Sequence, residues 1–172
     1  MDEAERKTFE LYFEKVIDAS VDFDPTPGEA IGIALPGEDE ISQWLRVNCA
    51  DLKISNIRII RRIFRACGQF SEIVADVRTE IRRDMLRSLT FLAWAVFVPK
   101  DGPSIEFLSG WGFAQWVGLD KKEKNAEEAE WARILQQYKF TNFDELDRAM
   151  INGIQKGYFD DGSVLLEINK MQ

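Results

Sequence analysis

The sequence predicts a mainly α-helical protein, a bundle of about eight helices in two small subdomains with little or no sheet. Two observations support this fold class. Apolar residues recur at steps of three and four along most of the 172-residue chain, and several of these stretches begin with residues that cap helices. Apolar residues make up 45% of the chain, which is enough to bury a core.

The first two helices are expected near the amino terminus. Residues 3–18 place their apolar side chains on one helical face. The alternating residues 21–24 are typical of a short strand, which the following proline would end. Residues 26–29 combine a threonine N-cap, a proline at the first helical position and a glutamate whose side chain can reach back to the N–H group of the N-cap. This pattern predicts a short helix that stops at Leu35.

Three longer helices are expected in the middle of the chain. Residues 38–51 are expected to form an amphipathic helix with one apolar face and one solvent-exposed polar face. Ser55 is expected to cap the next helix, whose apolar stripe extends for more than five turns, to about Val77. The helix over residues 79–97 becomes almost entirely apolar after Leu86, so its second half is expected at the centre of the core.

The last third of the chain predicts further helices. Residues 104–119 contain short helical pieces, weakened by glycine and serine, and residues 126–138 form a regular amphipathic helix. Thr141 or Asn142 is expected to cap the helix after that, because each precedes an acidic residue by three positions. Gly157 is expected to end it.

Charge is distributed unevenly along the chain. The whole sequence has 30 acidic and 22 basic residues and a net charge of −8, which argues against a surface that binds nucleic acid throughout. Residues 53–87 differ, because they hold nine basic and four acidic side chains. A basic site is therefore expected to be local, and nucleic acid is disfavoured as the partner.

Composition also narrows the location and the chemistry. No apolar stretch reaches about 18 to 20 residues and the acidic start has no signal-peptide pattern, so we expect a cytoplasmic protein without membrane contact. The chain has no histidine, and Cys49 and Cys67 lie in apolar helical patterns. Metal sites and Ser/Cys-His catalysis therefore lack their usual residues. Asp160 and Asp161 lie in polar turn sequence, and nothing marks them as an acid/base pair.

The most distinctive pattern is a row of arginines. They are Arg58, Arg61, Arg62 and Arg65. Their spacing of i, i+3, i+4 and i+7 places them on one helical face, opposite the isoleucines. Like charges on one face repel, so either acidic side chains of the same chain or an acidic partner should face them. Arg58 lies in the first turn, where its side chain and the helix N-terminus can act together on a phosphate.

Two other groups of residues have plainer interpretations. The basic side chains of residues 78–87 alternate with acidic ones and are expected to form i,i+4 pairs along a solvated helix face. Both basic groups together could form a nucleic-acid stripe, although no aromatic residue is interleaved as a stacking platform. The aromatic residues between Trp94 and Trp116 are expected in the core or on a docking face, with a small-molecule pocket as the alternative.

No nucleotide-hydrolysing site is expected in this chain. The phosphate-binding pattern G-x-x-x-x-G-K-[ST] is absent, and no apolar strand ends in paired acidic residues that could hold magnesium. We therefore expect that the chain is not an enzyme by itself and that it binds no cofactor alone.

Three segments, residues 12–18, 23–30 and 55–63, resemble the C-terminal half of bacterial P-loop ATPases of the KAP-like and AAA+ kind. In those proteins a helical lid follows the nucleotide-binding core, and an N-x-R motif opens one lid helix with the sensor-2 arginine. The resemblance implies that Arg58 is this nucleotide-sensing arginine and that Asn56 helps to fix the start of its helix. It also implies that ATP is bound only together with a separate core.

The resemblance implies a domain organisation as well. Residues 1–24 would end the ATPase core, residues 25–98 would form the lid-like helical bundle, and residues 99–172 would be a C-terminal helical extension. The partner would be the P-loop ATPase core or another protein, and a homo-oligomer is compatible with this interpretation.

An alternative hypothesis belongs to a different class. The chain would be a free-standing helical interaction or regulatory protein, for instance one derived from a phage, that binds an acidic partner. The residues expected to bind this partner are Arg61, Arg62 and Arg65. A third hypothesis is nucleic-acid binding through residues 53–87.

Overall fold

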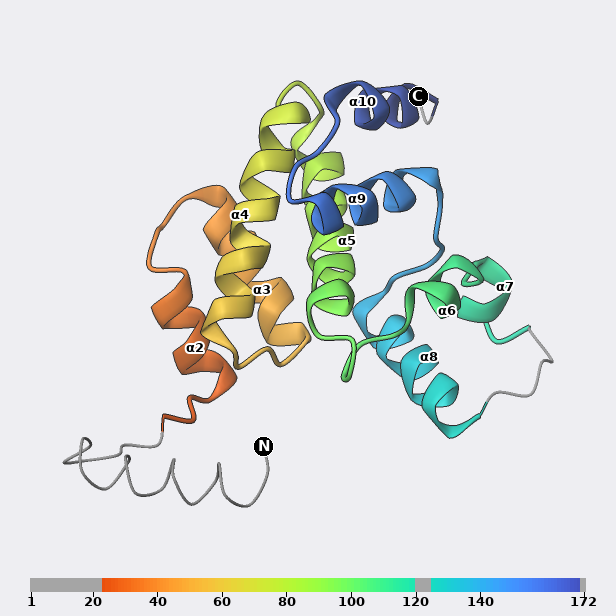
Figure 1. Cartoon of the computed structure of the whole chain (residues 1–172), viewed down its shortest axis with the longest axis horizontal. Helices are drawn as coiled ribbons and strands as arrows, with labels where there is room; N and C mark the ends of the chain where they lie inside the picture. Colours follow the sequence, from red (N-terminus) through yellow and green to blue (C-terminus); the bar gives the residue numbers. More distant parts are fainter. Residues whose placement is uncertain (1–22, 120–124, 171–172) are drawn as a thin grey trace, which may run out of the picture.

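A computed structural model describes residues 23–119 and 125–170. Within these ranges the chain forms nine helices and no strand (Figure 1), which confirms the mainly helical fold class. The helices are α2 (Pro27–Ala34), α3 (Glu40–Asp51), α4 (Ile57–Ile73), α5 (Thr79–Phe97), α6 (Ile105–Ser109), α7 (Phe113–Trp116), α8 (Ala126–Tyr138), α9 (Glu145–Lys156) and α10 (Asp161–Lys170). The helix predicted over residues 3–18 lies outside the described residues, and so does the first half of the predicted strand at 21–24.

The first described helix begins as its sequence predicts. The Thr26 hydroxyl accepts a hydrogen bond from the Glu29 N–H, and the Glu29 carboxylate accepts one from the Thr26 N–H at 2.9 Å. This capping box uses two donors that a helix N-terminus would otherwise leave unpaired. α2 ends at Ala34 and its C-cap is Leu35, as expected.

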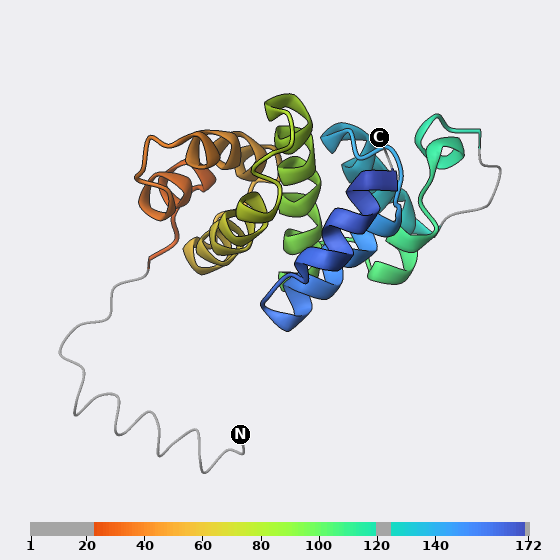
Figure 2. The same cartoon turned by 90° about the horizontal axis from the view of Figure 1, so that it is seen from above.

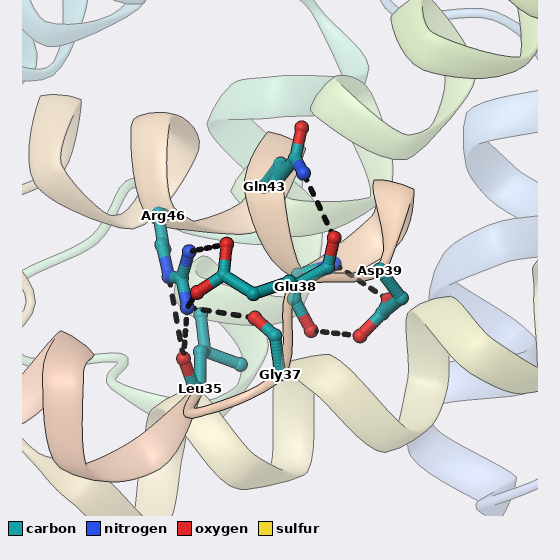
Figure 3. Close-up of polar contacts among 7 residues, drawn as sticks. Leu35, Gly37, Glu38, Asp39, Gln43 and Arg46 are labelled. Atoms are coloured by element: carbon teal, nitrogen blue, oxygen red, sulfur yellow. Dashed lines mark hydrogen bonds and ion pairs between the residues drawn. The ribbon is translucent and has the colours of Figure 1, made fainter.

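The loop between α2 and α3 is held by an arginine of α3 (Figure 3). Arg46 Nη2 donates to the carbonyl oxygens of Leu35 at 2.8 Å and Gly37 at 2.7 Å, and it pairs with the Glu38 carboxylate at 3.3 Å. Asp39 caps α3 by accepting from Ser42 N at 2.9 Å. α3 therefore begins at Glu40, two residues later than predicted, because Glu38 belongs to the loop that Arg46 fastens.

The central helix of the molecule is α5. It packs against α3 and α4 and also against α9, and Figure 1 and Figure 2 show α2, α3 and α4 on one side of it and α6, α7 and α8 on the other. Leu86, Leu89 and Leu92 of α5 are fully buried, and the buried Phe91 ring lies 5.1 Å from the ring of Tyr138 and 5.2 Å from that of Phe140. The prediction that this helix forms the centre of the core is confirmed.

The carboxyl-terminal helices differ from the prediction at two points. α8 occupies the predicted range, but the N-cap of α9 is Asp144 instead of Thr141 or Asn142. Asp144 Oδ1 accepts from Asp147 N at 3.0 Å, and Asp147 Oδ2 accepts from Asp144 N at 3.1 Å. These two bonds form a capping box in which Asp147 occupies the position where glutamate is usual. α9 ends as predicted at Gly157, whose φ of 80° is left-handed.

The sequence analysis did not predict α10. Its first residues are polar, and only Val164 and Ile168 are buried along it, so the apolar stripe is too short to recognise. α10 packs against α9 and α4 and thereby joins the end of the described chain to its middle. The buried apolar residues of all the described helices except α7, which has none, belong to one cluster. The proposed boundaries at residues 24/25 and 98/99 stay predictions.

Candidate functional site

The helix that carries the arginine row begins at an asparagine. Asn56 is the N-cap of α4, and its Oδ1 accepts hydrogen bonds from the N–H groups of Arg58 at 3.0 Å and Ile59 at 3.3 Å. The prediction that Ser55 caps this helix was wrong, because the chain turns one residue later. Two N–H groups at the helix start are thus already satisfied, which leaves the Arg58 side chain as the principal donor for an anion there.

The four arginines form one exposed surface on α4. We call Arg58, Arg61, Arg62 and Arg65 the arginine face. All four are exposed, whereas Ile60, Ile63 and Cys67 on the opposite side of the helix are fully buried. The predicted separation of a charged face from an apolar face is therefore confirmed for α4.

Ion pairs among the described residues do not account for the arginine face. In the part of the chain that the structure describes, no carboxylate oxygen lies within 4.0 Å of a guanidinium nitrogen of this face. Arg62 lies over the Phe97 ring, 3.7 Å from its centroid, so this residue has a packing role as well as a charge. Arg58, Arg61 and Arg65 present their charge to solvent.

The second basic group, on α5, pairs in a way that was not predicted. Arg82 Nη2 lies 2.9 Å from the Glu40 carboxylate, and Arg87 Nη2 lies 3.2 Å from that of Asp51. Both acidic partners belong to α3, so these pairs join two helices instead of running along one helix face. Pairing between helices depends on tertiary packing, which the local charge pattern of α5 does not contain.

The aromatic residues between Trp94 and Trp116 divide into buried and exposed members. Trp94 and Trp111 are buried, and Trp111 Nε1 donates to the Phe140 carbonyl at 2.9 Å. Phe113 is 64% exposed and its ring is tilted against that of Trp116, with 6.0 Å between ring centroids. Phe97, Phe107 and Trp116 are partly buried and pack against the core, so most of this group belongs to the core or its edge, the first of the three interpretations from the sequence.

A groove that the sequence analysis missed lies between α3, α5 and α8. Its volume is about 940 Å³ and its lining contains five basic and three acidic side chains together with Trp44 and Trp94. Arg87 reaches across it, with Nε and Nη2 donating to the Tyr138 carbonyl at 3.1 and 2.7 Å, while Tyr138 Oη donates to the Arg87 carbonyl at 2.9 Å. The three helices are far apart in sequence, so no local pattern could reveal this groove.

The two cysteines are buried thiols of the core. Burial raises the pKa of Cys49 to about 12 and the pKa of Cys67 to about 12. Cys67 Sγ lies 3.9 Å from the hydroxyl of Thr90, which is also buried. Both thiols are therefore protonated at neutral pH and neither is an activated nucleophile.

Several further findings bear on the class of protein. The described residues hold no group of three or more His, Cys, Asp or Glu side chains placed to bind a metal ion. None of the described helices combines the length and the apolar character needed to cross a lipid bilayer.

No protein-family model, curated protein or solved structure matches the chain. The resemblance to P-loop ATPases thus rests on the motif residues alone and stays a prediction.

Proposed function

We propose that this chain is a cytoplasmic helical interaction protein whose arginine face binds an acidic surface of a partner protein. The supporting observation is the row of exposed charges on α4, with no carboxylate of the described residues close to it. Guanidinium groups suit this role because each offers a planar fork of donors to a carboxylate. The buried isoleucines behind the row hold α4 in place, so the charges are presented on a rigid element.

A charge-reversal experiment tests this proposal. The full chain captures a partner from a cell extract, the partner is purified, and its affinity for defined variants is measured by titration calorimetry. Arg61→Glu combined with Arg65→Glu should weaken binding at least about tenfold, because attraction becomes repulsion across the interface. Added salt should also weaken the wild-type complex.

The matched control is Arg78→Glu combined with Lys100→Glu. Both residues are exposed and lie outside α4, and this variant changes the net charge by the same amount. It should bind as tightly as the wild type. Equal loss of affinity in the two double variants, or none in the α4 variant, would refute the proposed interface.

A second candidate function is nucleotide sensing in complex with a P-loop ATPase core. The observation that favours it is the position of Arg58, which is exposed in the first turn of α4 directly after the Asn56 cap. In this version the core binds ATP, Arg58 reaches its phosphates, and movement of the helical bundle is passed on to a further partner.

The identity of the captured partner and its turnover test this second function. If the partner is a P-loop ATPase, Arg58→Ala should lower ATP turnover of the saturated complex at least about tenfold. Arg61→Ala is the matched control and should lower affinity while turnover at saturation is unchanged. A partner without a phosphate-binding loop would exclude nucleotide sensing and leave the interaction proposal standing.

A further inference from the structure

The groove between α3, α5 and α8 contains a backbone feature that helix formation alone does not explain. Lys53 and Lys139 have φ angles of 52° and 62°, and they are the only non-glycine residues with positive φ in the described ranges. Both line this groove. A left-handed conformation is strained for a residue with a side chain, so two such lysines at one site call for a physical reason.

Each lysine occupies the position after a helix at which glycine is most common. Ile54 N donates to the Cys49 carbonyl and Phe140 N to the Leu135 carbonyl, the bonds that close the ends of α3 and α8 around Lys53 and Lys139. α9 ends in the usual way, with Gly157 at a φ of 80°. The helix dipole favours a basic residue near a C-terminus, but it does not require that residue to take the left-handed position.

The charges of the groove do not cancel among themselves. Of its acidic residues, Asp51 pairs with Arg87 and Glu130 pairs with Arg133. This leaves three basic residues and one acidic residue of the lining with no oppositely charged group within 4.0 Å in the described part of the chain. They are Lys53, Arg83, Lys139 and Asp84. The groove therefore has a surplus of positive charge in a protein whose net charge is −8.

A residue that lines the groove also carries an unpaired donor. Asn48 is 4% exposed, and its Oδ1 accepts from Arg87 Nη1 at 3.4 Å, which orients the amide. Its Nδ2 has no acceptor among the described residues. A buried donor without an acceptor is destabilising, and rotation of the Asn48 amide toward the groove would let an oxygen atom of a ligand pair with it.

We propose that the groove between α3, α5 and α8 binds an acidic peptide segment of a partner protein. The carboxylates of the peptide meet Lys53, Arg83 and Lys139, and one of its carbonyl oxygens accepts from the amide of Asn48 after that amide has rotated toward the groove. Its backbone N–H groups supply donors to Asp84. A nucleic-acid strand fits less well, because its phosphate backbone offers acceptors only and is repelled by that carboxylate. A volume of about 940 Å³ holds several peptide residues and far exceeds one small ion.

The test uses the full chain, labelled with nitrogen-15, and an N-acetylated, C-amidated hexaglutamate peptide as the probe. We expect the peptide to shift the backbone amide signals of Lys53, Arg83 and Lys139 and the indole signal of Trp44. Lys53→Asn combined with Lys139→Asn should weaken binding at the groove at least about fivefold, since asparagine tolerates the left-handed conformation but carries no charge. Absence of shifts at the groove, or equal affinity of this variant, would overturn the proposal.

Two controls separate this site from the arginine face and from a purely structural role. Arg61→Glu with Arg65→Glu should leave the signals at the groove responsive to peptide, so the two proposals can fail independently. Lys53→Gly with Lys139→Gly should raise the melting temperature by relieving the left-handed conformations and should also weaken peptide binding. Unchanged peptide affinity in this glycine variant would show that the lysines only end their helices. Tighter binding of oligo(dT) than of hexaglutamate would overturn the choice of a peptide.

Discussion

At the scale of single residues, Asp147 is a buried carboxylic acid within the described part of the chain. Burial, together with the neighbouring charge of Asp144, raises the pKa of Asp147 to about 7. The group nevertheless accepts the hydrogen bond that begins α9. The sequence shows Asp147 only as one of several aspartates near the start of this helix. The packing around Asp147, which the sequence pattern does not contain, decides that it is buried.

This raised pKa predicts a pH dependence of stability. The unfolded pKa is about 3.9, so the folded state binds more protons between about pH 4 and 7, and the free energy of unfolding falls as pH rises through that window. Asp147→Asn keeps an oxygen to cap α9 and removes the charge. Its stability relative to wild type should therefore rise by more than about 1.4 kcal/mol from pH 5 to pH 8, the equivalent of one pKa unit. Urea unfolding at both pH values measures this, and parallel pH profiles would contradict it.

A second prediction at this scale concerns two glycines. A Cβ atom on Gly153 would lie 2.2 Å from the Phe159 ring, whereas one on Gly68 would meet nothing within 4 Å. Phe159 is buried, 5.5 Å from the Phe70 ring, so Gly153→Ala should cost about 1–3 kcal/mol. Gly68→Ala, inside α4, should instead stabilise by about 0.5–1 kcal/mol. Thermal unfolding distinguishes them, and equal effects would show that the ring moves freely.

At the scale of elements, the two faces of α4 could be predicted from helical periodicity, whereas its cap could not. The positions of its arginines and isoleucines follow from the helical repeat alone, and the structure confirms both faces. The local pattern predicted Ser55 as the cap instead of Asn56, because both residue types are good caps and their order does not decide between them, whereas the resemblance to P-loop ATPases implied a role for Asn56 at the helix start. α10 was not predicted because only two of its residues are buried, too few to give a recognisable apolar stripe.

On the arginine face, we expect a charge reversal that weakens binding of the partner to stabilise the folded protein. Arg61→Glu replaces repulsion by attraction to Arg58 and Arg65, three and four positions away, and should stabilise the protein by about 0.5 kcal/mol at low salt. The gain should shrink at high salt because exposed charges are screened. Arg148→Glu is the control and should destabilise, since it breaks the pair with Glu145. Calorimetric melting at two salt concentrations measures both variants, and a destabilising effect of Arg61→Glu would argue for a partner inside the chain.

At the scale of the whole molecule, α3, α5 and α8 are joined through one side chain. Arg87 of α5 pairs with Asp51 of α3, donates to the Tyr138 carbonyl of α8 and lies 4.2 Å from the centroid of the Tyr138 ring. This residue therefore shapes the groove as well as the fold. The pairs expected from the sequence lay along α5, and the structure places them between helices.

Removal of this guanidinium should be costly. Arg87→Met leaves the Tyr138 carbonyl and Asp51 without their donor and should lower the free energy of unfolding by about 2–3 kcal/mol. Arg87→Lys keeps the charge without the planar fork and should cost an intermediate amount. Arg83→Met, one turn earlier and without such partners, should change stability by less than about 0.5 kcal/mol. Urea unfolding of the three variants measures the differences, and similar values for positions 83 and 87 would contradict the central role of Arg87.

The sequence by itself determined the helical class, the ranges of most helices and the charged face of α4, because caps and helical periodicity act over about four neighbouring residues. Tertiary structure alone decided the pairing of α5 with α3, the burial of Asp147 and the groove lined by Lys53 and Lys139. These features bring together residues that are tens of positions apart, and their energies depend on packing and desolvation that no local pattern encodes.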